Sequence, residues 1–256
     1  MKLSPRNLLM IGISAASLIL VAGTSTLASA ATARKGMTTR GVQAKLTPAR
    51  VSHARELLGG TYRRSPAKRV ESIQDIKTFV RKAVENELPK KFKSKASKIT
   101  QAILTESERH GFDPLFVMAV IKTESSFIPN QIGGVGEIGL MQIRPTTAKW
   151  LQEKLGKKHP LGYRNEKSLY DVTTNIRIGT AYFAMLRETF NSDSPLYVAA
   201  YNMGATNVKR NLKNAVVPRE YASRIMKRYV GFYEALEQQI SLEKQVLEGR
   251  HLVASR

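Results

Sequence analysis

Cysteine is absent from this chain of 256 residues. The absence excludes disulfide bonds, cysteine-ligated metal sites and a lipid-modified cysteine at a cleavage point. Acidic residues are scarce as well, since 20 of them face 41 lysines and arginines, and the formal net charge is +21. Such an excess of positive charge favours anionic partners. Nucleic acid is one candidate, and a cell-wall polymer that carries peptide carboxylates is another.

Long apolar runs are also lacking, except near the amino terminus. Residues 1–30 have the layout of a secretory signal peptide, with two basic residues, an apolar stretch over residues 8–21 and the sequence Ala-Ser-Ala at residues 28–30. We expect cleavage after Ala30, which would lower the charge of +21 to about +19; a short anchor helix is the alternative. No other window holds about 18 consecutive apolar residues. The sequence therefore predicts an exported protein of the periplasm or cell envelope that is not lipid-anchored.

The rest of the chain divides by composition. Residues 31–95 are basic and poor in large apolar residues, which predicts a partly disordered arm with one or two helices, the first at 48–58. Residues 96–240 show one helical pattern after another and no strand signal longer than a few residues. Residues 241–256 are more polar and predict a helical tail. The predicted fold class is mainly α.

One apolar stretch, "LFVMAVIKTESSF" at 115–127, has clear boundaries. Asp113 and Pro114 are a typical N-cap followed by a proline in the first helical position, so a helix should begin at Pro114. Residues 128–139 carry four glycines and a proline, which predicts a loop. The helix should therefore end close to Glu124.

Glu124 is unusual because a carboxylate follows an otherwise apolar face. At 100° per residue it shares that face with Val117 and Ile121. Burial of a carboxylate favours its neutral form, and a carboxyl group that stays protonated near neutral pH can act as a general acid on a glycosidic oxygen. The alternative is that Glu124 only caps the helix or reaches solvent. Spacing alone does not decide between them.

Three short motifs place Glu124 in a wider pattern. They are Glu124-Ser125, Gly139-Leu140-Met141-Gln142 and Ala200-Tyr201-Asn202. Their order and spacing resemble the catalytic domain of soluble lytic transglycosylases, which are relatives of goose-type lysozyme. "NIRIGTAYF" at 175–183 is also similar to the family's segment before Ala-Tyr-Asn. The resemblance spans about residues 96–233 and implies a lysozyme-like transglycosylase domain.

The sequence departs from the family at two places. The family usually shows a proline, then Glu-Thr, then a tyrosine two residues on; here "VPREYASRI" compresses this motif, and Tyr221 fits the tyrosine. Many members carry a serine nine residues after the catalytic glutamate, where this chain has Gly133. The contact of that serine must be lost or supplied by another group.

The resemblance implies a reaction and a substrate. The substrate would be peptidoglycan glycan strands, cleaved without water at the β-1,4 bond between N-acetylmuramic acid and N-acetylglucosamine. Glu124 would act first as acid and then as base, leaving 1,6-anhydromuramic ends. No metal or other cofactor is implied. The basic arm would allow contacts with anionic wall or membrane surface, and no nucleic acid is expected.

The resemblance also implies a set of substrate-binding residues around Glu124. Amide side chains can read acetamido and hydroxyl groups, phenols can donate hydrogen bonds and offer a flat face to sugar, and a methionine can line the groove. Two alternatives stay open: that Ser125 only supports the backbone, and that Tyr201 is an ordinary core residue. We read Trp150, Tyr170 and Tyr182 as packing residues. The set is Ser125, Met141, Gln142, Tyr201, Asn202 and Tyr221.

Three rival functions remain at this point. Glu137 precedes the Gly-Leu-Met-Gln motif, and if it faces the cleft it could hold a water and make the enzyme a hydrolytic muramidase. The second rival is a non-catalytic wall-binding protein with a lysozyme-like body. The third is a nucleic-acid binder. Charge alone suggests it, and the sequence contains no recognisable nucleic-acid-binding motif.

Overall fold

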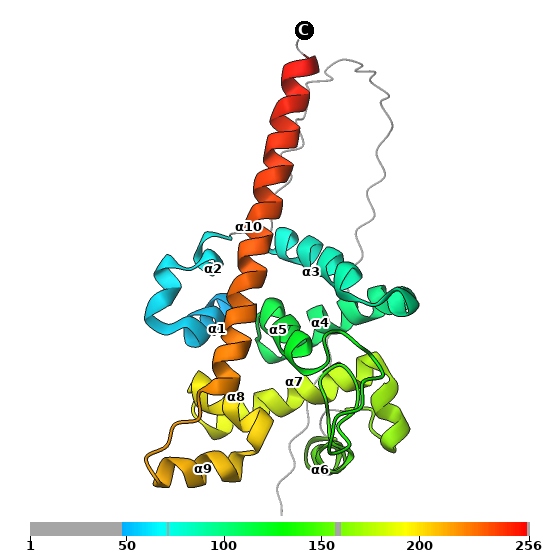
Figure 1. Ribbon diagram of the computed structural model, residues 1–256, viewed down its shortest axis with the longest axis vertical. Coiled ribbons are helices and arrows are strands. Elements are labelled where there is room, and N and C mark those ends of the chain that lie inside the picture. The colour runs from blue at the N-terminus through cyan, green and yellow to red at the C-terminus, as the bar shows by residue number, and fades with distance from the viewer. Residues whose placement is uncertain (1–47, 71, 157–159, 255–256) are drawn as a thin grey trace, which may run out of the picture. The chain divides into compact units, whose positions relative to one another are not determined.

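A computed structural model describes residues 48–70, 72–156 and 160–254 (Figure 1). Over these residues the chain is built from helices, and its only β pairing consists of isolated bridges from Ile138 to Ile132 and Ile143. The expectation of a mainly α fold is confirmed. The predicted signal peptide and the arm up to residue 47 lie outside the described residues. Among the described helices none is long and apolar enough to cross a membrane.

The helices follow one another with short connections. Three of them are 3₁₀ helices: η1 (Gly59–Arg64), η2 (Lys90–Lys95) and η3 (Glu166–Tyr170). The α-helices are α1 (Pro48–Leu58), α2 (Pro66–Arg69), α3 (Ile73–Glu87), α4 (Ala96–His110), α5 (Pro114–Glu124), α6 (Pro145–Leu155), α7 (Val172–Thr189), α8 (Ser194–Met203), α9 (Ala205–Lys213) and α10 (Glu220–Ala254).

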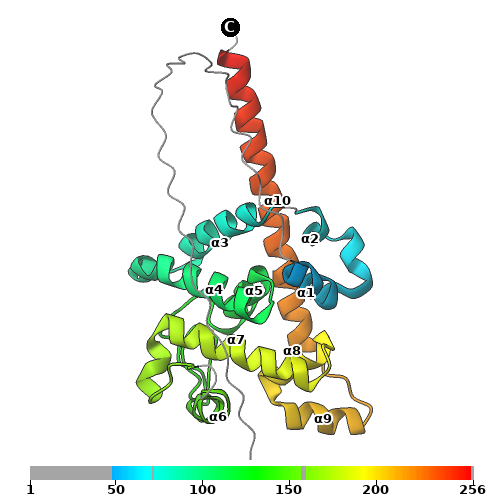
Figure 2. The same cartoon turned by 180° about the vertical axis from the view of Figure 1, so that it is seen from behind.

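Helix α5 is the central element of the core. Every residue from Leu115 to Ile121 is at most 1% exposed, because α3, α4 and α10 contact it from different sides (Figures 1 and 2). A helix that is apolar all round needs such an enclosed position. It begins where the sequence predicts, since the Asp113 carboxylate accepts a hydrogen bond from the Leu115 amide at 3.0 Å and Pro114 follows the cap.

Helix α10 lies along α5 through an apolar stripe. Ile225 and Leu236 on this stripe are fully buried, and Tyr229 between them is buried as well. Residues 241–248 of the same helix are exposed. The buried half of α10 therefore presents tyrosine hydroxyls to α5, and these contacts shape both ends of α5.

Helix α1 packs into the core, although composition alone predicted an arm in this region. Arg50 and His53 are 2% and 0% exposed. The guanidinium of Arg50 lies 3.2 Å from the Asp113 carboxylate, and the Asp113 amide donates to Nδ1 of His53 at 3.0 Å. Burial lowers the pKa of His53 well below its usual range, so the ring is neutral and its Nδ1 can accept. These contacts tie the basic segment to the start of α5.

Candidate active site

The chain turns sharply where α5 ends. Ser126 and Phe127 both have positive φ, of 49° and 61°. The hydroxyl of Ser125, which is buried, donates to the Leu140 carbonyl at 2.8 Å and so joins the helix end to the Gly-Leu-Met-Gln segment. Ser125 was predicted to bind substrate or to support the backbone, and its observed contacts are with the backbone.

Asn175 on α7 holds the Gly-Leu-Met-Gln segment in place. Its side chain accepts from the Met141 amide at 2.8 Å and donates to the carbonyls of Ile138 and Leu169 at 2.8 and 3.0 Å. Gly139 approaches this amide so closely that a Cβ there would lie 2.3 Å from Nδ2, and its φ is +84°. Both facts require glycine at the first position of the motif.

Met141 and Gln142 take different places in this segment. The Met141 side chain is fully buried, and a Cβ on Gly179 of α7 would lie 2.4 Å from its sulfur. It was predicted to line the groove, but the structure places it in the layer behind. Gln142 lines the cleft, and its amide nitrogen donates to the carbonyls of Gln131 and Gly139 at 3.1 and 2.9 Å. Its oxygen is the amide atom left to face the cleft.

A cleft of about 390 Å³ opens at the end of α5. It brings together four of the predicted site residues, which come from α5, the loop after it and α8. Polar groups from four further positions join them, and these were not predicted as substrate-binding: Glu137, Arg144, Thr147 and Tyr182. The four predicted residues are Glu124, Gln142, Tyr201 and Asn202.

Tyr221 reaches Glu124 from the first turn of α10. Its hydroxyl donates a hydrogen bond to Oε1 of Glu124, although 97 residues separate the two in sequence. Burial raises the pKa of Glu124 above its ordinary value of 4.5; the hydrogen bond from Tyr221 and the charge of Arg224 lower it, and the charge of Glu137 raises it. Burial is the largest effect. Glu124 is therefore a half-buried carboxyl group that holds its proton to higher pH than a free one.

Tyr201 serves both the core and the cleft. Its ring stacks on Phe183 at a centroid distance of 3.9 Å and an interplanar angle of 4°. Its hydroxyl donates to the Met141 carbonyl at 2.8 Å, and burial raises its pKa well above 10.0. Since the hydroxyl is engaged with the backbone, the part of Tyr201 that faces the cleft offers mainly an aromatic surface.

The sequence could have indicated one of the additional lining residues, Arg144, but not another, Tyr182. Arg144 follows the Gly-Leu-Met-Gln motif by two residues, so proximity to that motif could have marked it. Tyr182 was read as packing, and its ring does lie 5.4 Å from that of Tyr201, but it also lines the cleft. Nothing in the spacing of α7 distinguishes Tyr182 from a core tyrosine.

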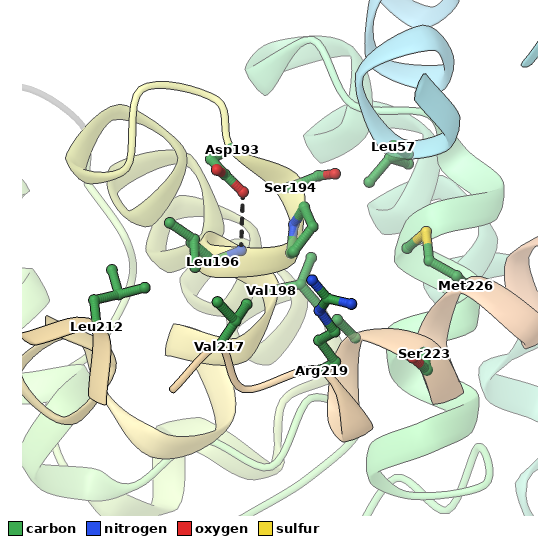
Figure 3. Close-up of a pocket in the computed structure, with 12 residues that line it drawn as sticks. Leu57, Asp193, Ser194, Leu196, Val198, Leu212, Val217, Arg219, Ser223 and Met226 are labelled. Atoms are coloured by element: carbon green, nitrogen blue, oxygen red, sulfur yellow. Dashed lines mark hydrogen bonds between the residues drawn. The ribbon is translucent and has the colours of Figure 1, made fainter. Parts of the chain in front are cut away.

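A larger hollow, of about 490 Å³, lies elsewhere between α1, α8 and α10 (Figure 3). Its lining is largely aliphatic, including Leu57, Val198 and Val217. Figure 3 shows its one carboxylate, Asp193, bonded to the Leu196 amide at 3.4 Å, which makes it the N-cap of α8. None of the predicted site residues lines this hollow. The cleft at Glu124 is therefore the candidate active site.

Comparison with known proteins bears on the same part of the chain. The family described as "Transglycosylase SLT domain" matches residues 101–222. The chain is 33% identical over 150 residues to membrane-bound lytic murein transglycosylase C of Edwardsiella ictaluri, and 31% identical over 150 residues to the protein of that name from Yersinia enterocolitica. Each alignment covers 56% of this chain and 40% of the relative, so the chain spans well under half the length of these relatives.

Solved structures of two lytic transglycosylases are also similar to this chain. One is an inactive mutant of Slt from Pseudomonas aeruginosa, at 27% identity, and the other is the 70 kDa soluble lytic transglycosylase of Escherichia coli, at 26%. Both have a TM-score of 0.48 and cover 54% of this chain and 24% of theirs. The family match contains Glu124, Gln142, Asn202 and Tyr221. Residues 101–222, a little under half of the chain, therefore match the transglycosylase SLT domain family.

Proposed function

We propose that this protein is a peptidoglycan lytic transglycosylase that cleaves the β-1,4 bond between N-acetylmuramic acid and N-acetylglucosamine and leaves 1,6-anhydro ends. The observation that carries the proposal is the state of Glu124. It is a carboxyl group of raised pKa, hydrogen-bonded by Tyr221, at the edge of a cleft that also exposes Asn202 and Gln142. A single carboxyl group in that setting is suited to give up a proton and take one back.

Glu124 acts twice in the proposed mechanism. It first donates its proton to the glycosidic oxygen, while the carbonyl oxygen of the substrate's own acetamido group attacks the anomeric carbon; the bond between that carbon and the glycosidic oxygen breaks, and the N-acetylglucosamine side leaves as an alcohol. The resulting Glu124 carboxylate then takes the proton of the muramic C6 hydroxyl, whose oxygen displaces the acetamido oxygen from the anomeric carbon. The second step regenerates protonated Glu124 and consumes no water. Both steps require a pKa near the working pH, which burial of Glu124 favours.

The other residues act around this carboxyl group. Tyr221 has a pKa well above 10.0, raised chiefly by burial, so its hydroxyl keeps its proton and can orient Glu124 in both steps. Asn202 and Gln142 line the cleft, and in this proposal the Asn202 amide and the Gln142 oxygen bind hydroxyl and acetamido groups of the sugar. Ser125 and Met141 act indirectly, because their side chains fix the Gly-Leu-Met-Gln segment from behind.

We further propose that the protein acts in the periplasm or cell envelope. Support comes from the layout of residues 1–30, which lie outside the described residues, and from the membrane-bound lytic transglycosylases to which the chain is similar. The net charge of +21 suits a polymer that carries peptide carboxylates. We propose no lipid anchor on this chain, because it contains no cysteine.

Digestion of purified cell wall followed by mass spectrometry tests the reaction. Wild-type protein should release muropeptides that lack one water relative to reducing sugars, and Glu124→Gln should release them at least about 1,000-fold more slowly, because it removes the only proposed acid and base. Glu153→Gln, at an exposed position on α6, is the matched control. Equal activity of Glu124→Gln and Glu153→Gln would overturn the proposal.

A hydrolytic muramidase is the second candidate, and one observation favours it. Glu137 lines the same cleft as Glu124, and hydrolytic glycosidases commonly use two carboxylates. The two reactions differ in product mass by one water. Reducing ends formed at the rate of chain cleavage would favour hydrolysis, whereas anhydro ends would exclude it as the main reaction.

A further inference from the structure

Glu137 is held inside the cleft although it belongs to a glycine-rich loop. Its side chain is only 22% exposed, and Oε2 accepts a hydrogen bond from the Val135 amide at 3.2 Å. Oε1 lies 3.8 Å from Nε of Arg144, which is too long for a hydrogen bond, and the Arg144 side chain is 56% exposed. A solvated loop glutamate would reach outward; this one lies beside the glycan-facing groups.

Gly133 makes room for this carboxylate. A Cβ at residue 133 would lie 2.5 Å from Oε2 of Glu137 and 2.7 Å from Oε1 of Gln142, both well inside van der Waals contact. The φ of Gly133 is not in the left-handed region, so a side chain there is opposed by space and not by backbone conformation, and the ends of the Glu137 and Gln142 side chains would have to shift. At the neighbouring Gly134 a Cβ would meet nothing within 4 Å. The restriction is therefore specific to the position that faces Glu137 and Gln142.

We propose that Glu137 is a substrate-contacting residue, whose carboxylate accepts a hydrogen bond from a hydroxyl or acetamido N–H group of the sugar in the cleft, and that Gly133 is required because it leaves the space for that carboxylate. The inference rests on the proposed function, since it takes the ligand to be a glycan. A sugar offers many donors, and a carboxylate that has one backbone donor and a distant arginine keeps acceptor capacity for them.

The position also explains a departure of the sequence from its family. The family's serine would stand at residue 133, and its Cβ alone would collide with the present Glu137 carboxylate. The two positions are thus coupled: a side chain at 133 and the observed position of Glu137 exclude each other. Glu137 supplies a polar group to the cleft in place of the one that residue 133 lacks.

Binding measurements isolate this contact from the chemistry. The probe is the tetrasaccharide of N-acetylglucosamine, titrated into Glu124→Gln protein so that no turnover occurs. Adding Glu137→Ala should weaken binding by about 10- to 100-fold, the typical effect of losing a charge-assisted hydrogen bond. In the active background the same change should raise KM by a similar factor and leave kcat within a few-fold. Glu137→Gln keeps the shape of the side chain, so its affinity for the tetrasaccharide should lie between that of Glu137→Ala and that of the protein with Glu137.

Substitutions of the two glycines test the coupling. Gly133→Ala should weaken binding about as much as Glu137→Ala, because the methyl group displaces the carboxylate, whereas Gly134→Ala should have a clearly smaller effect. In the Glu137→Ala background, Gly133→Ala should lose part of its effect, since the clash with the Glu137 carboxylate is gone and only the one with the Gln142 amide remains. Fully additive losses would overturn the coupling.

The outcomes separate this inference from the proposed function. Unchanged tetrasaccharide affinity and KM in Glu137→Ala, with thermal melts equal to the parent, would overturn the contact while leaving the transglycosylase proposal intact. Tetrasaccharide binding that depends on Glu137, in a protein that releases no anhydro-muropeptides, would support the contact and overturn the proposed reaction. A variant with a lowered melting temperature is replaced by Glu137→Gln, for which a smaller loss of affinity in the same direction is expected.

Discussion

The two ends of α5 carry two carboxylates that receive similar partners and differ in setting. At the amino-terminal end, the hydroxyls of Tyr229 and Tyr233 donate to Oδ2 of Asp113 at 2.8 and 2.6 Å. At the carboxyl-terminal end, the hydroxyl of Tyr221 donates to Glu124. All three tyrosines come from α10, so the same pair of helices builds both clusters.

The carboxylates of Asp113 and Glu124 differ in how their negative charge is compensated. Asp113 is completely buried and has Arg50 at 3.2 Å and the Leu115 amide at 3.0 Å besides the two tyrosines. Glu124 has Tyr221 as its hydrogen-bond donor, and among the described residues no cation forms an ion pair with it, Arg224 acting only from a longer distance. The helix dipole adds to this contrast, because it stabilises an anion at the start of a helix and destabilises one at the end.

The comparison separates a structural carboxylate from a chemical one. A buried anion with a cation and three donors is fixed, and its removal leaves a buried positive charge. A half-buried carboxyl group with a single donor favours the neutral form and can exchange its proton with a ligand. If this distinction is right, damage at the two ends should appear in different measurements.

The largest effect is expected at the amino-terminal end of α5, around Asp113. Asp113→Ala removes the carboxylate that lies 3.2 Å from the buried Arg50 guanidinium and accepts from two tyrosine hydroxyls, so the free energy of unfolding should fall by about 3–5 kcal/mol. Urea denaturation followed by circular dichroism measures it. Glu124→Gln, at the other end of the same helix, should show no such loss. A loss below about 1 kcal/mol for Asp113→Ala would mean that the cluster does not hold α1 against α5.

A smaller effect, on catalytic rate and not on stability, is expected for Tyr221→Phe. Loss of the hydrogen bond to Glu124 should reduce kcat for wall digestion by about 10- to 100-fold, because the carboxyl group is no longer oriented. That hydrogen bond also lowers the pKa of Glu124. Its removal should therefore move the limb of the pH–rate profile that reports Glu124 to higher pH.

Tyr229→Phe is the matched control for this variant. It removes a hydrogen bond from the same helix to the other carboxylate, and should lower the free energy of unfolding by about 1–2 kcal/mol without moving the pH–rate profile. If both variants shifted the profile equally, the two ends of α5 would not be functionally distinct.

Many of the residues that meet at the carboxyl-terminal end of α5, around Glu124, could be predicted from the sequence. The start of α5 follows from the local pair Asp113-Pro114, and Glu124, Gln142 and Asn202 were marked by short motifs with a characteristic order. Tyr221 was chosen from a compressed motif, and the structure brings its hydroxyl to Glu124. Local capping signals and motif order were enough here, because each is carried by a few adjacent residues.

The contacts at the amino-terminal end of α5, around Asp113, could not be predicted in the same way. The contact of Arg50 with Asp113 joins residues 63 positions apart, and the basic composition around Arg50 pointed to an arm rather than to a buried helix. Met141 was misplaced for a related reason: an apolar residue beside a motif can face the cleft or the core, and only the proximity of Gly179 shows which. Composition and spacing do not encode such long-range contacts.

The pH dependence of stability gives a third, smaller test of the comparison. The pKa of Glu124 is raised in the folded state above its ordinary value of 4.5, so the stability that comes from its proton is present below the unfolded pKa and is lost as the pH rises through the folded pKa. Glu124→Gln cannot lose a proton. Its melting temperature should therefore equal that of wild type near pH 4 and exceed it increasingly towards about pH 8. A gap that shrank with rising pH would contradict the raised pKa.

The smallest effect is expected far from both ends of α5, at the pair of Lys82 and Glu243. Their charged atoms are 2.8 Å apart, close to the spacing seen in the buried pair of Arg50 and Asp113, but the side chains are 44% and 51% exposed. Water and salt screen such a pair, so Glu243→Gln should lower the free energy of unfolding by less than about 0.5 kcal/mol. If urea denaturation gave a loss near that of Asp113→Ala, the distance between charges rather than burial would govern these ion pairs, and the contrast drawn for α5 would need another cause.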